Sequence, residues 1–245
     1  MTKAPGSGSG PSPVAGRPEW SRPGAALLVV VVALVADAAI VLNWSTLKPG
    51  LGPLPDAVGA LLDIVVVAGP LLIGALVAAR LGGPGIRRAL GLRVTALDLA
   101  LGFFVALLAR AVMELIFPTV GGLVSAFADD DRTAVLVVTI VGAVLIAPVC
   151  EELLFRGALQ RALGAALARG AGPVVGGIVA VAISTVAFVL LHTVPYGGAV
   201  PPSAVLSPLL VGLGAGALVA ATGRLAPGIV AHVLFNLGGV LLLLW

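Results

Sequence analysis

Long apolar runs, separated by short breaks rich in glycine, proline and charged residues, follow one another from residue 25 to the end of the chain. A helix needs about 20 largely apolar residues to cross the hydrocarbon core of a bilayer. Backbone groups in lipid must be paired within the segment, and no run alternates apolar and polar residues as a barrel strand does. The pattern therefore predicts an all-α fold, a polytopic transmembrane helix bundle of about seven to eight spans. The expected spans are 25–42, 57–80, 96–117, 133–149, 173–194, 206–222 and 226–244.

The first 24 residues depart from this pattern, because glycine, proline and serine dominate them. A segment of that composition does not bury enough apolar surface to fold. We therefore expect a disordered cytoplasmic tail at 1–24 and a single transmembrane domain at 25–245.

Composition strengthens the membrane assignment. The 245 residues are 60% hydrophobic and only 10% charged, and the mean hydropathy is +1.18. Soluble domains are about 45–50% apolar and about 25% charged. The net charge of +3 does not indicate a nucleic-acid partner, because the basic residues lie in short loops between apolar runs. The expected surroundings are a lipid bilayer, and the single cysteine excludes an internal disulfide.

The distribution of basic loops predicts an orientation. Basic loops alternate with neutral or acidic ones along the chain. By the positive-inside rule the N-terminus then lies in the cytoplasm, and we expect the plasma membrane as the location. The number of spans stays open at 149–169, a helix-like stretch that could continue the fourth span, lie at the interface or re-enter the membrane. Seven spans would place the C-terminus outside and eight would place it inside.

Several ionisable residues fall within apolar spans, where a charge costs at least about 2.5–3.5 kcal/mol at the helix centre and usually pairs or serves function. Asp37 and Asp63 are isolated carboxylates, for which a hydrogen bond within the bundle or a place at its edge is the simplest explanation. Arg110 and Glu114 are spaced i, i+4 and should form a structural ion pair. Asp98 is close to the end of a span and should reach the interface.

A denser group of charges, Glu151, Glu152 and Arg156, follows the fourth apolar run. On a helix Glu152 and Arg156 share a face, whereas Glu151 is rotated by about 100° from Glu152. Arginine thus neutralises one carboxylate and leaves the other available. A carboxylate in a poorly solvated site has a raised proton affinity, which suits a general base that acts on water. The alternative is a surface charge cluster at the end of a span.

Both histidines of the chain, His192 and His232, lie in apolar spans. Each alone would more often be a satisfied core group than a functional one. Asn236, however, lies one turn after His232 on the same face. One Glu, two His and one Asn on three separate helices make a plausible hydrolytic constellation. Neither Gly-x-Ser-x-Gly nor His-Glu-x-x-His occurs, which argues against those hydrolase classes.

Three motifs occur in order: Glu-Glu-Leu-Leu-Phe-Arg at 151–156, Phe-x-x-x-His at 188–192 and His-x-x-x-Asn at 232–236. In this order and hydrophobic context, the sequence resembles the CPBP family of intramembrane proteases, also called the Abi or type II CAAX prenyl endopeptidase family. The resemblance covers about 130–240, the expected protease core. The earlier spans match only as generic membrane helices.

The resemblance implies an intramembrane endopeptidase that hydrolyses peptide bonds of a membrane-associated or prenylated-type protein or peptide. Glu151 would activate the attacking water with help from His192. His232 and Asn236 would complete the catalytic site, and Asn236 is a candidate to stabilise the oxyanion.

Glu152 and Arg156 would give structural support to the helix that carries Glu151. A divalent metal is a further possibility, because Glu151, His192 and His232 could hold zinc and leave a position open for water. The same residues could also work without a metal, with Glu151 as the base.

Two other functions fit the same residues. One is a non-catalytic membrane scaffold or bacteriocin-immunity protein of the same fold, and the other is a proton-coupled transporter. The expected spans also create a geometric conflict. They place Glu151 and His232 toward the cytoplasmic ends of their helices, but His192 lies about 19 residues, or about 28 Å, into its own. Either the fifth span is tilted and shifted, or 149–169 re-enters the membrane. The sequence indicates no oligomeric state.

Overall fold

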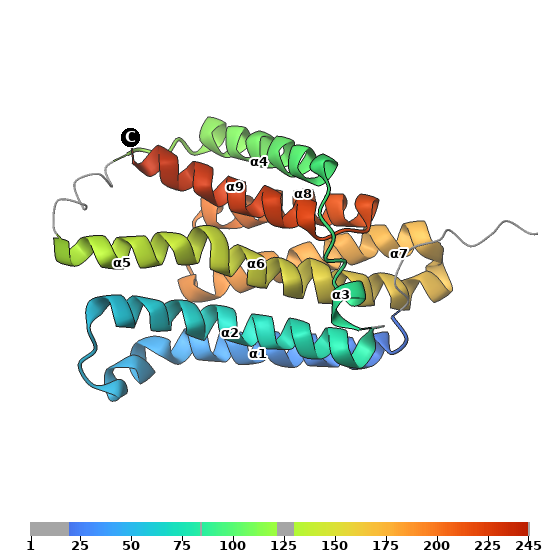
Figure 1. Cartoon of the computed structure of the whole chain (residues 1–245), viewed down its shortest axis with the longest axis horizontal. Coiled ribbons are helices and arrows are strands. Elements are labelled where there is room, and N and C mark those ends of the chain that lie inside the picture. The colour runs from blue at the N-terminus through green and yellow to red at the C-terminus, as the bar shows by residue number, and fades with distance from the viewer. Residues whose placement is uncertain (1–19, 84, 122–129, 245) are drawn as a thin grey trace, which may run out of the picture.

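The computed structural model describes residues 20–83, 85–121 and 130–244, and within these ranges every regular element is a helix (Figure 1). The expected all-α bundle is therefore confirmed. Most of the expected tail lies outside the described residues. Its last part is ordered, since Trp20 is buried and the first helix begins at Pro23.

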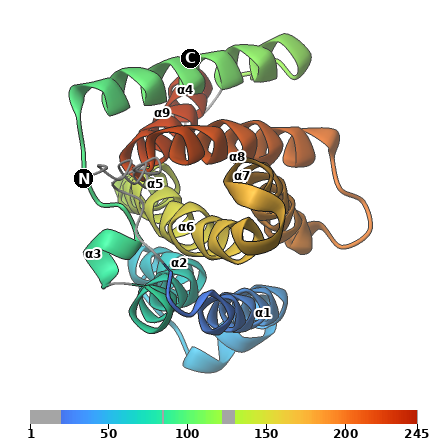
Figure 2. The same ribbon diagram turned by 90° about the vertical axis from the view of Figure 1, so that its right-hand side faces the viewer.

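The N-terminal half forms two separate parts of the bundle. Helix α1 (Pro23–Leu47) and helix α2 (Asp56–Gly82) lie side by side in antiparallel directions. After the short α3 (Ile86–Ala89), helix α4 (Ala96–Ile116) lies on the opposite side of the molecule (Figure 2). Both parts leave apolar side chains exposed, as expected of surfaces that face lipid. Examples are Leu28, Val32 and Val35 on α1 and Phe104 and Leu108 on α4.

A continuous helical segment passes through the centre of the bundle. It consists of α5 (Asp130–Val141), a π-helical turn (Gly142–Ile146), α6 (Ala147–Glu152), a second π-helical turn (Leu153–Leu159) and α7 (Gln160–Thr193). Every residue from 150 to 160 is buried. A helix buried on all sides lies in the core of a bundle rather than on its surface.

Helix α7 reverses its direction at Gly172, where the backbone has φ 78° and ψ 164°. Only glycine adopts such angles readily. The stretch 149–169 thus continues the helix of the fourth expected span as far as the reversal. In the described chain six helices are long and apolar enough to cross a membrane. One of them, 132–196, folds back at Gly172 and supplies two arms, which gives seven.

Helix α8 (Pro202–Thr222) and helix α9 (Ala226–Leu243) complete the bundle. The end-on view shows three layers, with α1 and α2 at one side, the α6–α7 hairpin in the middle, and α8 with α9 beyond it (Figure 2). Helix α4 covers the outer face of α9. The middle layer therefore packs against helices on both of its faces.

Candidate active site

One cavity of about 280 Å³ contains all four of the residues expected to be catalytic, Glu151, His192, His232 and Asn236. They come from α6, α7 and α9, and Phe188 of α7 lines the cavity beside them. Helix α8 closes another side. Its lining residues are Ser207, Pro208 and Val211. Residues far apart in the sequence thus meet around a single hollow.

Gly172 explains how Glu151 and His192 come to lie at the same level. Glu151 is 21 residues before the reversal (172 − 151) and His192 is 20 residues after it (192 − 172). Two antiparallel arms of nearly equal length bring their ends together. The expected separation of about 28 Å, from 1.5 Å per residue, is therefore wrong. It assumed that the helix ends at residue 149, whereas the helix continues and leaves Glu151 near its middle.

Glu151 is buried and stands between the two imidazoles. Its Oε2 atom is 3.7 Å from Nε2 of His232 and 4.0 Å from Nε2 of His192. The His192 side chain is 33% exposed, whereas that of His232 is 4% exposed. The cavity is thus open on the His192 side and closed on the His232 side.

Hydrogen bonds determine which ring nitrogens carry protons. Nδ1 of His192 is 2.9 Å from the carbonyl oxygen of Phe188, and Nδ1 of His232 is 3.1 Å from Oε1 of Glu152. Both oxygens are acceptors, so the network assigns an N–H to each Nδ1. When the rings are neutral, each Nε2 is an acceptor and faces Glu151. Three acceptors thus converge, and a water molecule could donate to two of them at a time.

The expected pairing of Glu152 with Arg156 is present, with 3.0 Å between Oε1 and Nη1 and both side chains fully buried. Glu152 also holds His232, a contact between helices that spacing along one helix does not reveal. Arg156 lies 4.3 Å over the ring of Phe188. That ring in turn packs at 4.3 Å from the imidazole of His192 and at 5.6 Å from that of His232. Phe188 therefore contacts both histidines and Glu152 contacts His232, while Arg156 contacts Glu152 and Phe188.

Asn236 has a structural partner in addition to the cavity. Its Nδ2 atom donates to the carbonyl oxygen of Ala143 at 2.8 Å. That carbonyl lies in the π-helical turn, where the N–H of Ala147 bonds to the carbonyl oxygen of Gly142. By the same pattern the carbonyl of Ala143 would accept from residue 148, but this is a proline and has no N–H. Asn236 supplies the missing donor. An amide carries two N–H groups, so a second one is left for the cavity.

The two carboxylates that look isolated in the sequence, Asp37 and Asp63, have different surroundings. The expected hydrogen bond within the bundle is present at Asp63 and, within the described ranges, absent at Asp37. Asp63 is not isolated, because Nζ of Lys48 lies 2.8 Å away and Nε1 of Trp44 lies 2.7 Å away. Asp37 is buried, and within the described chain neither of its oxygens has a hydrogen-bond partner. The pair of Arg110 and Glu114 is confirmed at 3.2 Å.

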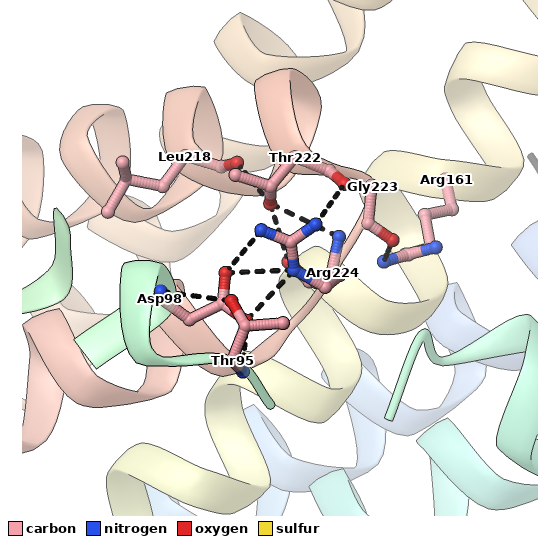
Figure 3. A network of polar contacts seen from close by, with 7 residues as sticks. All are labelled: Thr95, Asp98, Arg161, Leu218, Thr222, Gly223 and Arg224. Carbon is pink, nitrogen blue, oxygen red and sulfur yellow. Dashed lines mark hydrogen bonds and ion pairs between the residues drawn. The ribbon is translucent and has the colours of Figure 1, made fainter. Parts of the chain in front are cut away.

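Asp98 lies in the first turn of α4, near the end of the span as expected, and its side chain is fully buried. It caps the start of α4 together with Thr95 and binds Arg224, whose Nη2 lies 2.7 Å from Oδ1 (Figure 3). The hydrogen bond to Asp98 raises the pKa of Arg224 above its usual value. In the same network Arg161 donates to the carbonyl of Gly223 at 2.8 Å. The network thus ties the start of α4 to the turn between α8 and α9.

A metal ion does not fit the residues as they stand. Among the residues that the structure describes, no three His, Cys, Asp or Glu side chains are grouped closely enough to hold one. Carboxylate and imidazole are donors that zinc accepts, and two ligands at about 2.1 Å in a tetrahedral site lie about 3.4 Å apart. The separations of 3.7 and 4.0 Å around Glu151 are longer.

Comparison with known proteins places the cavity within a family match. Residues 133–238 match the family model described as type II CAAX prenyl endopeptidase, Rce1-like. A search of curated proteins and a search of solved structures found no match. The matched segment contains Glu151, His192, His232 and Asn236, and it excludes α1, α2 and α4.

Proposed function

Because residues 133–238 match the family model described as type II CAAX prenyl endopeptidase, Rce1-like, we propose that this membrane protein hydrolyses peptide bonds of a membrane-associated or prenylated-type protein or peptide. The observation that supports the proposal is the convergence of the Glu151 carboxylate and two imidazole Nε2 atoms in one cavity. These groups suit the activation of water. We further expect the N-terminus on the cytoplasmic side of the plasma membrane.

In the proposed reaction Glu151 is the general base. A water donates one hydrogen bond to Glu151 and the other to Nε2 of His192, and Glu151 takes a proton as the water oxygen attacks the peptide carbonyl carbon. The bond between that carbon and the nitrogen then breaks, and Glu151 returns the proton to the leaving amine. His192, on the open side of the cavity, helps to hold the water.

The remaining residues support the charges that develop. The free N–H of Asn236 is a candidate donor to the oxyanion of the tetrahedral intermediate. Glu152 fixes the ring of His232 by accepting from Nδ1, and it would stabilise that ring if it gained a second proton. Arg156 compensates the charge of Glu152, so the proposed net charge of the centre resides on Glu151.

The decisive substitution is Glu151→Gln, which keeps the shape of the side chain but cannot take up a proton. Purified protein in proteoliposomes should cleave a prenylated reporter peptide, and the variant should lose a factor of about 100 to 10,000 in rate, the usual share of a general base. Asp56→Asn, at the exposed start of α2 and away from the cavity, is the matched control and should cleave normally.

Cleavage at the wild-type rate by a folded Glu151→Gln variant would contradict the proposal. Treating the wild-type protein with a chelator tests whether cleavage depends on a metal. Loss of cleavage that zinc restores would support a metal at Glu151, His192 and His232, whereas unchanged cleavage would support the carboxylate acting alone. Proton flux without cleavage would identify a transporter, and neither activity would favour a scaffold or immunity role.

A further inference from the structure

Arg110 is a cation in the middle of α4, outside the segment that matches the family. Its side chain is only 19% exposed. A charge within a membrane-length helix is costly and needs a partner or a function. Glu114 provides one partner at 3.2 Å, but that pair uses only one of the guanidinium nitrogens.

The rest of the guanidinium contacts α9. Nη2 of Arg110 donates to the carbonyl oxygen of Phe235 at 2.7 Å, and the guanidinium carbon lies 4.1 Å from the centre of the Phe235 ring. Gly239 makes room for it, because a Cβ atom built there would lie 2.6 Å from Nη2. A carbonyl, an aromatic face and a glycine thus form a seat for Arg110 on α9.

This seat lies on the same turns of α9 as the catalytic side chains. Phe235 lines the cavity, and it is three residues after His232 and one before Asn236. On the central helical segment, His232 bonds to Glu152 at 3.1 Å and Asn236 bonds to the carbonyl oxygen of Ala143 at 2.8 Å. Rotation or sliding of α9 would lengthen both hydrogen bonds, and displacements of about 1 Å can cost about 100-fold in rate.

We propose that Arg110 is a positioning residue that fixes the rotation and height of α9 and thereby presents His232 and Asn236 to the cavity. Glu114 orients the guanidinium, and Glu114 is itself held by the backbone N–H of Thr119 at 2.7 Å and the hydroxyl of Thr119 at 2.8 Å. The inference rests on the proposed hydrolytic function, since it assigns a role to Arg110 in that site.

The test must separate the effect of Arg110 on the position of α9 from the effect of its ion pair with Glu114. In the double variant Arg110→Met/Glu114→Gln both charges are removed together, so no unpaired carboxylate is left in the helix. We expect kcat to fall by about 10- to 100-fold, with little change in KM, because α9 is misplaced but the cavity is kept. Glu114→Gln alone keeps the contacts of Arg110 with α9 but weakens its orientation, so its loss of kcat should be smaller than that of the double variant. Gly239→Ala should resemble the double variant, because its methyl group displaces the guanidinium without any change of charge.

A spectroscopic measurement keeps the inference testable apart from activity. The chain has only two histidines, so protein labelled with ¹⁵N-histidine gives two sets of ring signals, which His232→Ala assigns. The ring signals of His232 should shift in the double variant and in Gly239→Ala, and those of His192 should shift less. If neither set moves and kcat is unchanged, the inference is wrong. If Glu151→Gln cleaves normally, the proposed function fails instead, and the His232 signals still report on α9.

Discussion

Two buried carboxylates bind arginines in this protein, one in the centre of the bundle and one at its end. Glu152 pairs with Arg156 at 3.0 Å, and Asp98 pairs with Arg224 at 2.7 Å. Both carboxylates are fully buried. The arginines differ, because the Arg156 side chain is fully buried and the Arg224 side chain is 26% exposed.

The neighbours of the two pairs differ more than their geometry. Around Glu152 and Arg156 lie His232 and Phe188, groups that line the proposed catalytic cavity. Around Arg224 are a helix cap and a turn (Figure 3). The same two functional groups therefore contact the proposed catalytic side chains in one place and tie helix ends together in the other. Substitutions at the two pairs should separate activity from stability.

The largest effect is expected from Arg156→Met. The substitution leaves Glu152 as an uncompensated charge in the core, and loss of one partner of a buried pair costs about 3–5 kcal/mol in the free energy of unfolding. Glu152, which holds the ring of His232, also loses its countercharge, so cleavage should fall to background. Thermal unfolding in detergent and the peptide assay measure both effects. A variant with normal melting and normal cleavage would show that the pair is dispensable.

A smaller effect, confined to stability, is expected from Arg224→Gln. The variant loses the ion pair to Asp98 and should melt earlier, while cleavage stays within about twofold because the end of the bundle is distant from the cavity. Because the pKa of Arg224 is raised above that of an ordinary arginine, the side chain stays charged throughout the neutral range. The stability that the ion pair contributes is lost only when the pH rises through this raised pKa. The difference in melting temperature from wild type should therefore be constant between about pH 6 and 9. A marked loss of cleavage would place this pair in the catalytic machinery.

The smallest effect is expected at the cap itself. Thr95 accepts from the backbone N–H of Asp98, and Thr95→Ala should cost about 0.5–2 kcal/mol of unfolding free energy. Thr95→Ser keeps the hydroxyl and serves as the matched control. Equal destabilisation by both variants would mean that the methyl group, and not the hydrogen bond, is what matters.

Much of this architecture follows from local pattern. Apolar runs of membrane length predict helices because each helix satisfies its own backbone hydrogen bonds. The spacing of Glu152 and Arg156, or of Arg110 and Glu114, predicts an ion pair because residues four apart lie on the same face of a helix. The motifs also indicated which of the two glutamates stands free to face both histidines.

Contacts between helices could not be predicted in this way. Nothing in the spacing along one helix shows that Glu152 holds His232, that Asn236 caps the carbonyl of Ala143 or that Asp98 is buried by Arg224. The end of the fourth span was misplaced because its charged residues resemble a helix end. They are tolerated in the core since they pair with one another, a property that hydropathy does not register.

The reversal at Gly172 has a consequence for how the protein can vary. Both arms are helical between the bend and the cavity. The proximity of Glu151 and His192 therefore depends on the number of residues in each arm. One residue more or fewer in either arm would move a side chain by about 1.5 Å along its axis and turn it by about 100°. Exchanges of one amino acid for another leave that count intact. The number of residues between Gly172 and the cavity is therefore more tightly constrained in each arm than the identity of most of those residues.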